Sequence, residues 1–272
     1  MPLAHTMRRR TIAILFVAAG GVIAQSIPTR PRFDEFEVAS VKPSDPDLRG
    51  RWIRMVSTNE LEAKGHTLKT LIAAAYNLSP RAISGGPAWA DSDRYDILAR
   101  TPGAVRPNLD EQMAMLRKLL SDRFRLTFHR EPKEMRVYAL TVGKGGPKLK
   151  ESTTPIDATP EGPPLLAFTL SPAVVRMPAR NATMAELASV MQRAALADPV
   201  LDKTGLTARY DFDFEFAPDE TLFGGVLGKG PEDSAKPGLF AALQQQLGLR
   251  LEATRGMVDA VVIDRAGHPS AN

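Results

Sequence analysis

The 272-residue sequence contains no cysteine. This absence excludes disulfide bonds, thiolate zinc sites, iron–sulfur ligation and a cysteine nucleophile. It also excludes a lipoprotein anchor, because the lipid of such an anchor is carried by a cysteine. Histidine is nearly as scarce, with only four in the chain. A metal site would therefore have few histidine ligands to draw on.

Several catalytic motifs are also missing. No serine is followed by a lysine three residues later, so Lys203-Thr204-Gly205 lacks the nucleophile that accompanies Lys-Thr-Gly in penicillin-binding proteins. The chain has no His-Glu-x-x-His and no Gly-x-Ser-x-Gly, and the segment 144–148 does not fit a phosphate-binding loop. We therefore predict no catalytic residue, no metal ligand, no cofactor-binding residue and no cofactor.

His129 is the candidate for a catalytic alternative. His129-Arg130-Glu131 has the His-x-Glu spacing of a deaminase motif, but the cysteine half of that signature is absent. A zinc site needs at least three protein ligands. We expect His129 to lie on the polar face of a strand, solvated or paired with an acidic residue of a neighbouring strand. The alternative function is an envelope hydrolase that uses His129 with carboxylates.

Residues 1–24 have the pattern of a secretory signal peptide. Arg8, Arg9 and Arg10 precede a short apolar run, and Val22-Ile23-Ala24 offers small or apolar residues for a signal peptidase. The run from Thr11 to Ala24 is shorter than the roughly 20 residues that a membrane span needs. We expect cleavage after Ala24, a periplasmic or secreted product and no stable membrane span.

The charge of the remaining chain is nearly balanced. Residues 1–24 carry three arginines and no acidic residue, which leaves 32 basic against 31 acidic residues. A nucleic-acid interface needs clustered Lys and Arg. We therefore expect no nucleic-acid partner, and expect instead an envelope protein or a small ligand.

The clearest strand is Tyr210–Phe216. Its residues alternate, with Tyr210, Phe212, Phe214 and Phe216 on one face and acidic residues on the other. Because side chains alternate along a strand, the pattern predicts a strand with an aromatic core face and a solvated acidic face. Arg250 or Arg125 on an adjacent strand are the expected partners of the acidic face.

Helices and further strands follow from the same periodicities. Helices are expected after the N-caps Thr67 and Thr183, over 109–121, and over 239–247 with Gly248 as the terminating residue. Strands are expected over 36–42, 60–65, 95–99, 124–130, 135–142, 165–177, 200–201, 249–253 and 258–263. The segment Glu131–Glu134 is expected to form a hairpin-like turn.

Landmarks of the first half recur in the second. Thr67 matches Thr183, Arg94-Tyr95-Asp96 matches Arg209-Tyr210-Asp211, and two later strands match in the same order. The sequence predicts an α+β fold of two tandem repeats, each a strand–helix–strand–strand–helix–strand–strand unit with mostly antiparallel short sheets. The predicted division is a signal peptide at 1–24, a first repeat at 25–142, a Pro/Gly-rich linker at 143–164 and a second repeat at 165–272.

One loop is the candidate binding site. Gly85-Gly86-Pro87-Ala88-Trp89 combines glycines, which allow close backbone approach, with a tryptophan after a proline turn. We predict that Gly85, Gly86, Pro87 and Trp89 contact a partner or ligand. The alternative is that Trp89 only covers the core between a helix and a strand.

Ordered blocks over most of the chain resemble a known family. They are Phe36–Pro43, Gly85–Trp89, Arg94–Ile97, Leu120–Phe124, Tyr138–Leu149, Asp202–Asp211 and Leu239–Leu251. Together they are similar to a family of exported soil-bacterial proteins, abundant in acidobacterial genomes, that has no established function or catalytic residues. Some relatives carry this region beside the metallopeptidase of antibiotic-sensing receptors, so the resemblance implies a sensor role as a further alternative.

The order of elements in each half is also similar to the short N-terminal domain of secretins and TonB-dependent receptors. That domain is a protein-interaction module, although a shared fold does not by itself define function. We therefore expect an exported, non-catalytic binding protein of the cell envelope.

Overall fold

The computed structural model describes residues 30–154, 166, 168–231 and 235–270. The predicted signal peptide, residues 155–164 of the predicted linker and Leu165 at the start of the predicted second repeat lie outside the described residues. All the helices and strands below belong to one compact unit, Pro31–Asn272. The fold is α+β, as predicted, with helices packed on short and mostly antiparallel sheets.

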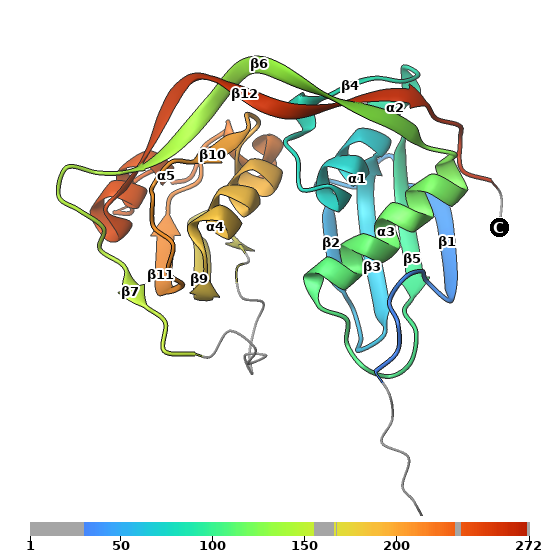
Figure 1. The fold of residues 1–272 in the computed structure, drawn as a ribbon, viewed down its shortest axis with the longest axis horizontal. Coiled ribbons are helices and arrows are strands. Elements are labelled where there is room, and N and C mark those ends of the chain that lie inside the picture. Colours follow the sequence, from blue (N-terminus) through green and yellow to red (C-terminus); the bar gives the residue numbers. More distant parts are fainter. Residues whose placement is uncertain (1–29, 155–165, 167, 232–234, 271–272) are drawn as a thin grey trace, which may run out of the picture. The chain divides into compact units, whose positions relative to one another are not determined.

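The first sheet is antiparallel throughout, in the order β1-β5-β3-β2. Its strands are β1 (Val38–Pro43), β2 (Trp52–Met55), β3 (Glu60–Thr67) and β5 (Arg94–Arg100). Helices α1 (Leu68–Ala75) and α3 (Leu109–Phe124) pack on one face of it, with the turn η1 (Pro80–Ala82) and the short helix α2 (Trp89–Ser92) between them in the chain. Figure 1 shows α3 lying across these strands.

A second antiparallel sheet has the order β7-β11-β9-β8. Its strands are β7 (Lys150–Glu151), β8 (Thr169–Leu170), β9 (Val175–Ala182) and β11 (Tyr210–Phe216). The helical segments are α4 (Met184–Val190), η2 (Met191–Ala195), η3 (Leu222–Gly225), α5 (Leu239–Ala242) and η4 (Leu243–Leu247). Part of the predicted linker therefore forms a strand, because β7 pairs with Tyr210 and Asp211.

The third sheet, in the order β10-β6-β12-β4, is built on two long strands. Its strands are β4 (Ile83–Gly85), β6 (Thr127–Val142), β10 (Val200–Asp202) and β12 (Leu249–Arg265). β6 and β12 pair antiparallel along almost their whole length, and we call this pair the β6–β12 ribbon. The short strands β10 and β4 pair parallel with β6 and β12, respectively (Figure 1).

The predicted turn at Glu131–Glu134 is wrong. β6 is one strand of 16 residues, Thr127–Val142, and it covers most of the predicted strand 124–130 and all of 135–142; Phe124 closes α3, and Arg125 and Leu126 precede the strand. Pro132 pairs with Asp259 in the part of the ribbon that has no third strand. A proline is tolerated there because no third strand lies beside the ribbon to accept a hydrogen bond from the N–H that proline lacks. The two predicted strands after Leu249 are likewise one strand.

Two hydrophobic cores share the β6–β12 ribbon. One core is formed by the first sheet, α1 and α3, and it includes Val261 and Ile263 of β12. The other is formed by the second sheet and the helices of the second half, and it includes Leu140 of β6. Each long strand therefore supplies buried residues to the core of the other half of the chain. The predicted domain boundaries at 142/143 and 164/165 stay predictions.

The aromatic strand β11 is buried as predicted. Phe214 and Phe216 have no exposed surface, and Tyr210 and Phe212 are less than 9% exposed. The acidic face has other partners than expected: Arg176 and Lys236 pair with Glu215, and Arg180 pairs with Asp213. The prediction of Arg250 and Arg125 is wrong, because Arg250 lies in β12, in a different sheet from β11, and Arg125 follows α3 outside any strand.

The predicted helix ends are confirmed. The side chain of Thr67 accepts a hydrogen bond from the Thr70 amide, and Thr183 forms a capping box with Glu186. Gly248 ends η4 with φ +68°, a left-handed conformation that glycine adopts without steric cost.

The repeated Arg-Tyr-Asp tripeptide makes the same contacts in both halves. Arg94 donates to the carbonyl of Gly65, and Asp96 accepts from the amide of Gly65. Arg209 and Asp211 make the corresponding two bonds to Asn181. Gly65 and Asn181 both have positive φ and stand two residues before the N-caps Thr67 and Thr183. The tripeptide thus fixes a strand-to-helix turn in each half. The tandem duplication stays a prediction, and the predicted repeat unit would end in one long strand in place of two.

Asp198 connects three segments. Its carboxylate is buried and accepts from Arg81 at 2.6 Å and lies 3.3 Å from Nε of Arg136. Beside it, the hydroxyl of Ser79 donates to the carbonyl of Ala197 at 2.6 Å. These contacts join η1 and β6 to the turn that precedes β10.

Candidate functional site

The two glycines of the candidate loop are required by packing. Gly85 and Gly86 have φ values of +72° and +76°. A Cβ on Gly85 would lie 2.7 Å from the carbonyl oxygen of Ile263 in β12, and one on Gly86 would lie 3.0 Å from Cγ2 of the same residue. The amide of Gly86 also donates to that carbonyl. These glycines therefore bring β4 against β12, and they position the start of α2.

Trp89, the first residue of α2, is half-buried and packs on two rings. Its indole stacks on the imidazole of His268, with centroids 4.3 Å apart and planes 25° apart. It also meets Tyr95 edge to face at 6.4 Å. Trp89 thus holds His268, a residue of the C-terminal segment, beside β5. A direct role of Gly85, Gly86, Pro87 and Trp89 in binding stays a prediction.

A groove of about 780 Å³ lies next to α2. We call it the α2 groove. Three segments of chain line it: the end of β1 with the following turn, the end of α2 with the start of β5, and the C-terminal segment. The lining residues are Val41, Lys42, Pro43, Ser44, Asp45, Pro46, Ser92, Asp93, Arg94, Tyr95, His268, Pro269 and Ser270. Clefts of this size are typical of ligand-binding sites.

Polar groups inside the α2 groove are held by each other. The hydroxyl of Tyr95 lies 3.1 Å from Nδ1 of His268, and a carboxylate oxygen of Asp93 lies 3.9 Å from the same atom. Burial, together with the charge of Asp93, raises the pKa of Tyr95. Tyr95 therefore keeps its proton at neutral pH, and its hydroxyl can donate a hydrogen bond to Nδ1 of His268.

Arg94 and Ser44 of the groove are also engaged in hydrogen bonds. The guanidinium of Arg94 donates to the carbonyls of Leu48, Gly50 and Gly65. Ser44 donates to Asp96 at 2.6 Å. The groove consequently offers proline and aromatic surface with the carboxylates of Asp45 and Asp93 and the ammonium of Lys42, because its arginine serves the fold.

The C-terminal segment that completes the groove is tied to the end of α3. The amide of Gly267 donates to the carbonyl of Phe124, and the amide of Ser270 donates to that of Arg123. His268 and Pro269 were not predicted from the sequence as site residues. The sequence signal that could have found them is the place of His268 five residues after the predicted strand 258–263.

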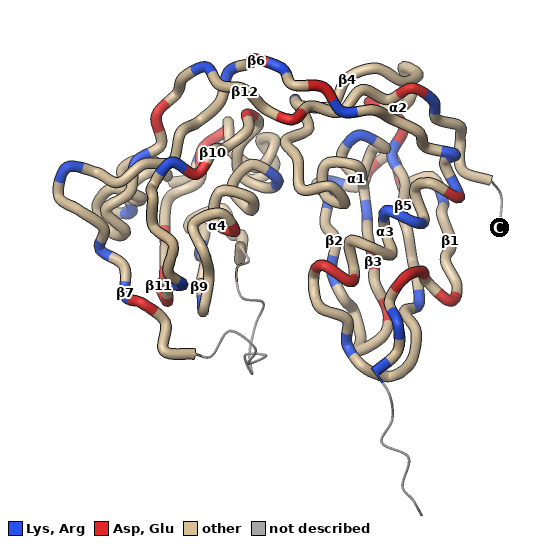
Figure 2. The backbone as a smooth tube through the Cα atoms, viewed as in Figure 1, with Lys and Arg blue, Asp and Glu red and all other residues tan. Residues whose placement is uncertain are grey.

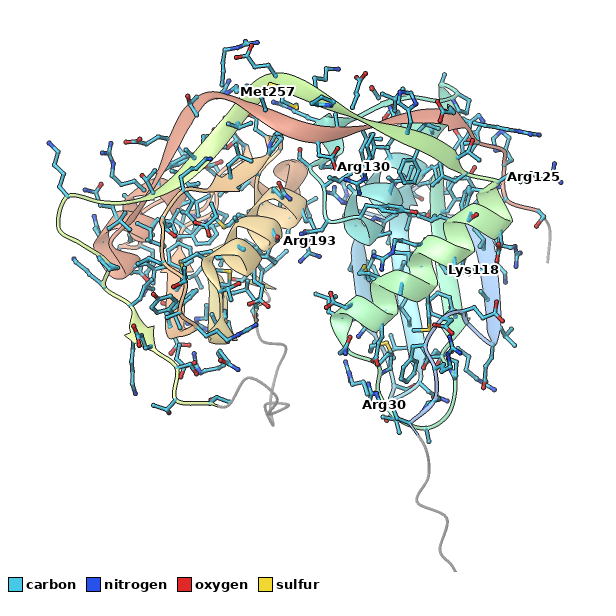
Figure 3. All side chains as sticks on the ribbon, in the orientation of Figure 1. Arg30, Lys118, Arg125, Arg130, Arg193 and Met257 are labelled. Carbon is cyan, nitrogen blue, oxygen red and sulfur yellow. The ribbon has the colours of Figure 1, made fainter. Side chains whose placement is uncertain are left out.

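His129 lies where the sequence predicted, on an exposed face, paired with an acidic residue of the neighbouring strand. Its Nδ1 is 2.7 Å from Oδ1 of Asp264 in β12, and both side chains are about half exposed. His129 does not line the α2 groove. His129 belongs to the β6–β12 ribbon, on which Arg130 and Met257 are labelled in Figure 3. For the hydrolase alternative, the described residues thus supply a histidine–carboxylate pair, His129 with Asp264.

Within the described part of the chain, no group of three or more His, Asp or Glu residues is placed to hold a metal ion. Among the helices of that same part, none has the length and apolar character needed to cross a membrane.

The fold and the groove define an α+β protein with an open surface site of ligand-binding size. The chain belongs to a family described as a protein of unknown function (DUF3738), whose model matches residues 69–266. No curated protein and no solved structure matches it. The expected membership of a family without established function is therefore confirmed, whereas the soil-bacterial origin and the likeness to the secretin and TonB-receptor domain stay predictions.

Proposed function

We propose that this protein is an exported binding protein of the cell envelope that takes a partner or small ligand in the α2 groove. The observation that carries the proposal is the groove itself, of about 780 Å³, assembled from three segments far apart in the sequence. The Trp89–His268 stack and the Gly85–Gly86 turn against β12 hold two of its walls. Export is supported by Arg8–Arg10 and the apolar run that follows them.

The lining of the groove defines the ligand that it fits. Val41, Pro43, Pro46, Tyr95 and Pro269 present apolar surface. Carboxylates at the edge, and a hydrogen-bonded Tyr95–His268 pair, provide the polar contacts. This combination suits an apolar or extended peptide-like group, because few polar contacts then suffice to orient it.

Filling the groove tests the proposal. Ser92 is exposed and lines the groove, so Ser92→Trp places a large ring in it. Ser57 is exposed in the turn between β2 and β3 and does not line the groove, so Ser57→Trp is the matched control. We expect recovery of partner or ligand from envelope extracts to fall about tenfold or more for Ser92→Trp, since at least 1.4 kcal/mol of binding is lost.

Equal recovery by Ser92→Trp and Ser57→Trp would contradict the proposal. The hydrolase alternative is separated in the same experiment by His129→Ala, which changes a residue outside the groove. We expect His129→Ala to recover the partner as wild type does. Turnover of an envelope substrate that disappears in His129→Ala would favour the hydrolase, and a sensor role would require that the recovered partner be a receptor component.

A further inference from the structure

A second, smaller groove lies at the other end of the β6–β12 ribbon, between the loop after β6 and the end of η4. It has a volume of about 420 Å³ and shares no lining residue with the α2 groove. We call it the glycine-loop groove. Its walls come from Gly143, Lys144, Gly145, Gly146 and Lys148 on one side and from Ala241, Gln244, Gln245 and Gly248 on the other.

The loop that forms one wall is fixed by backbone contacts. The amide of Gly143 donates to the carbonyl of Gly248, and the amide of Lys148 donates to that of Leu247. Gly146 has a φ of +76°, a left-handed conformation that favours glycine. A Cβ on Gly248 would lie 2.2 Å from the carbonyl oxygen of Gly146. These contacts hold the loop against the end of η4 before any ligand binds.

Gly145 differs from its neighbours in having no such reason to be glycine. Its φ is outside the left-handed range, and a Cβ placed on it would meet no atom within 4 Å. Neither packing nor a left-handed backbone conformation therefore requires glycine at this position. The absence of a side chain leaves the backbone of the loop bare where the loop borders the groove, which is the arrangement in which a glycine-rich loop approaches an anionic ligand.

The charge of the glycine-loop groove is positive. Its lining contains two lysines and no acidic residue. Within the described residues, neither Lys144 nor Lys148 pairs with a carboxylate. Figure 2 shows basic positions on the loop between β6 and β7, with acidic positions resuming at β7.

The polar groups are placed to orient an oxyanion. Nζ of Lys148 donates to the carbonyl of Gln245 at 3.0 Å, which holds this ammonium at the edge of the groove and leaves two of its N–H groups for a ligand. The exposed amides of Gln244 and Gln245 add donors from the opposite wall. Charged donors and amides together favour a phosphate group, and a groove of about 420 Å³ has room for an organic group attached to it.

We propose that the glycine-loop groove binds a phosphate monoester or diester through Lys144 and Lys148, with the bare backbone at Gly145 against the phosphate. The phosphate can belong to a small soluble molecule or to a lipid headgroup, and the experiment below separates these sources.

The test is an NMR titration of the full chain, followed at the backbone amides of Gly145 and Gly146. We expect glycerol 3-phosphate to shift both signals saturably at millimolar concentrations, and glycerol to shift neither. In Lys144→Gln/Lys148→Gln the affinity should fall about tenfold or more, because both charges that face the phosphate are removed. Lys203→Gln, at an exposed lysine outside the groove, is the matched control and should bind as wild type does.

Gly145→Ala gives a second and independent variant. Because the added methyl meets no atom of the protein, the thermal midpoint should stay unchanged or rise slightly, while glycerol 3-phosphate binding weakens severalfold. A purely structural glycine would show the reverse, with a lower midpoint and unchanged binding.

Vesicles of phosphatidylglycerol form the lipid arm. Binding to these vesicles that is lost in Lys144→Gln/Lys148→Gln supports the site with a lipid headgroup as its source, and saturable binding of glycerol 3-phosphate supports a soluble source. Binding in neither arm, or binding that is equal in wild type and the double variant, would overturn the proposal.

Discussion

Phe214→Ala is expected to lower the free energy of unfolding by about 3–5 kcal/mol. Phe214 has no exposed surface and lies in β11 against Phe216, with ring centroids 5.2 Å apart. Removing its ring exchanges buried aromatic surface for a cavity in the core of the second sheet. Urea unfolding followed by far-ultraviolet circular dichroism is the suitable measurement, since Trp52 and Trp89 both belong to the first half.

Phe240→Ala is the matched control for this substitution. Phe240 is 42% exposed in α5, and its ring centroid lies 5.6 Å from that of Tyr138 in β6. Its loss should cost less than about 1 kcal/mol, as most surface substitutions do. Equal unfolding midpoints for the two alanine variants would contradict the assignment of β11 as the central core strand.

The second large effect is a dependence of stability on pH that originates from His66. His66 is 5% exposed beside the turn fixed by Arg94 and Asp96. Burial, reinforced by the positive charge of Arg51, lowers the pKa of His66 to about 3. The folded protein therefore keeps this imidazole neutral, whereas the unfolded chain protonates it near pH 6.5.

The sign of the effect follows from which state binds the proton. Above pH 6.5 neither state is protonated at His66 and the stability is complete. As the pH falls from 6.5 towards 3, only the unfolded state takes up the proton, so stability decreases by up to about 1.4 kcal/mol per pH unit. At pH 4.5 the loss from this residue should be about 2–3 kcal/mol.

The measurement is urea unfolding at pH 7 and pH 4.5, followed by tryptophan fluorescence. Wild type should lose about 2–3 kcal/mol more between these two pH values than His66→Gln does. Comparing the change with pH, not the absolute stability, removes the packing cost of the substitution. The same loss in both proteins would show that His66 is not held neutral in the folded state.

The sequence predicted well those features that depend on neighbouring residues. The alternation in Tyr210–Phe216 predicted a buried strand, and Thr67, Thr183 and Gly248 predicted helix ends, because each signal is local. The repeated Arg-Tyr-Asp was recognised as a landmark, but its contacts to Gly65 and Asn181 required the fold.

Features that depend on distant pairing were predicted poorly. Glu131–Glu134 has the composition of a turn, and only the pairing with β12 makes it part of a strand. The α2 groove brings Pro43, Asp93 and His268 together, residues that no spacing in the sequence connects. The candidate loop was therefore found through its glycines and Trp89, while the groove that its helix borders was not.

Photocrosslinking in the native envelope tests most directly whether the α2 groove binds a partner. A photoreactive amino acid in place of Ser92, inside the groove, is compared with the same residue in place of Ser57, in the exposed turn outside it. We predict a covalent adduct of defined mass at position 92 and none at position 57. An absence of adducts at position 92, or the same adducts at both positions, would contradict the account.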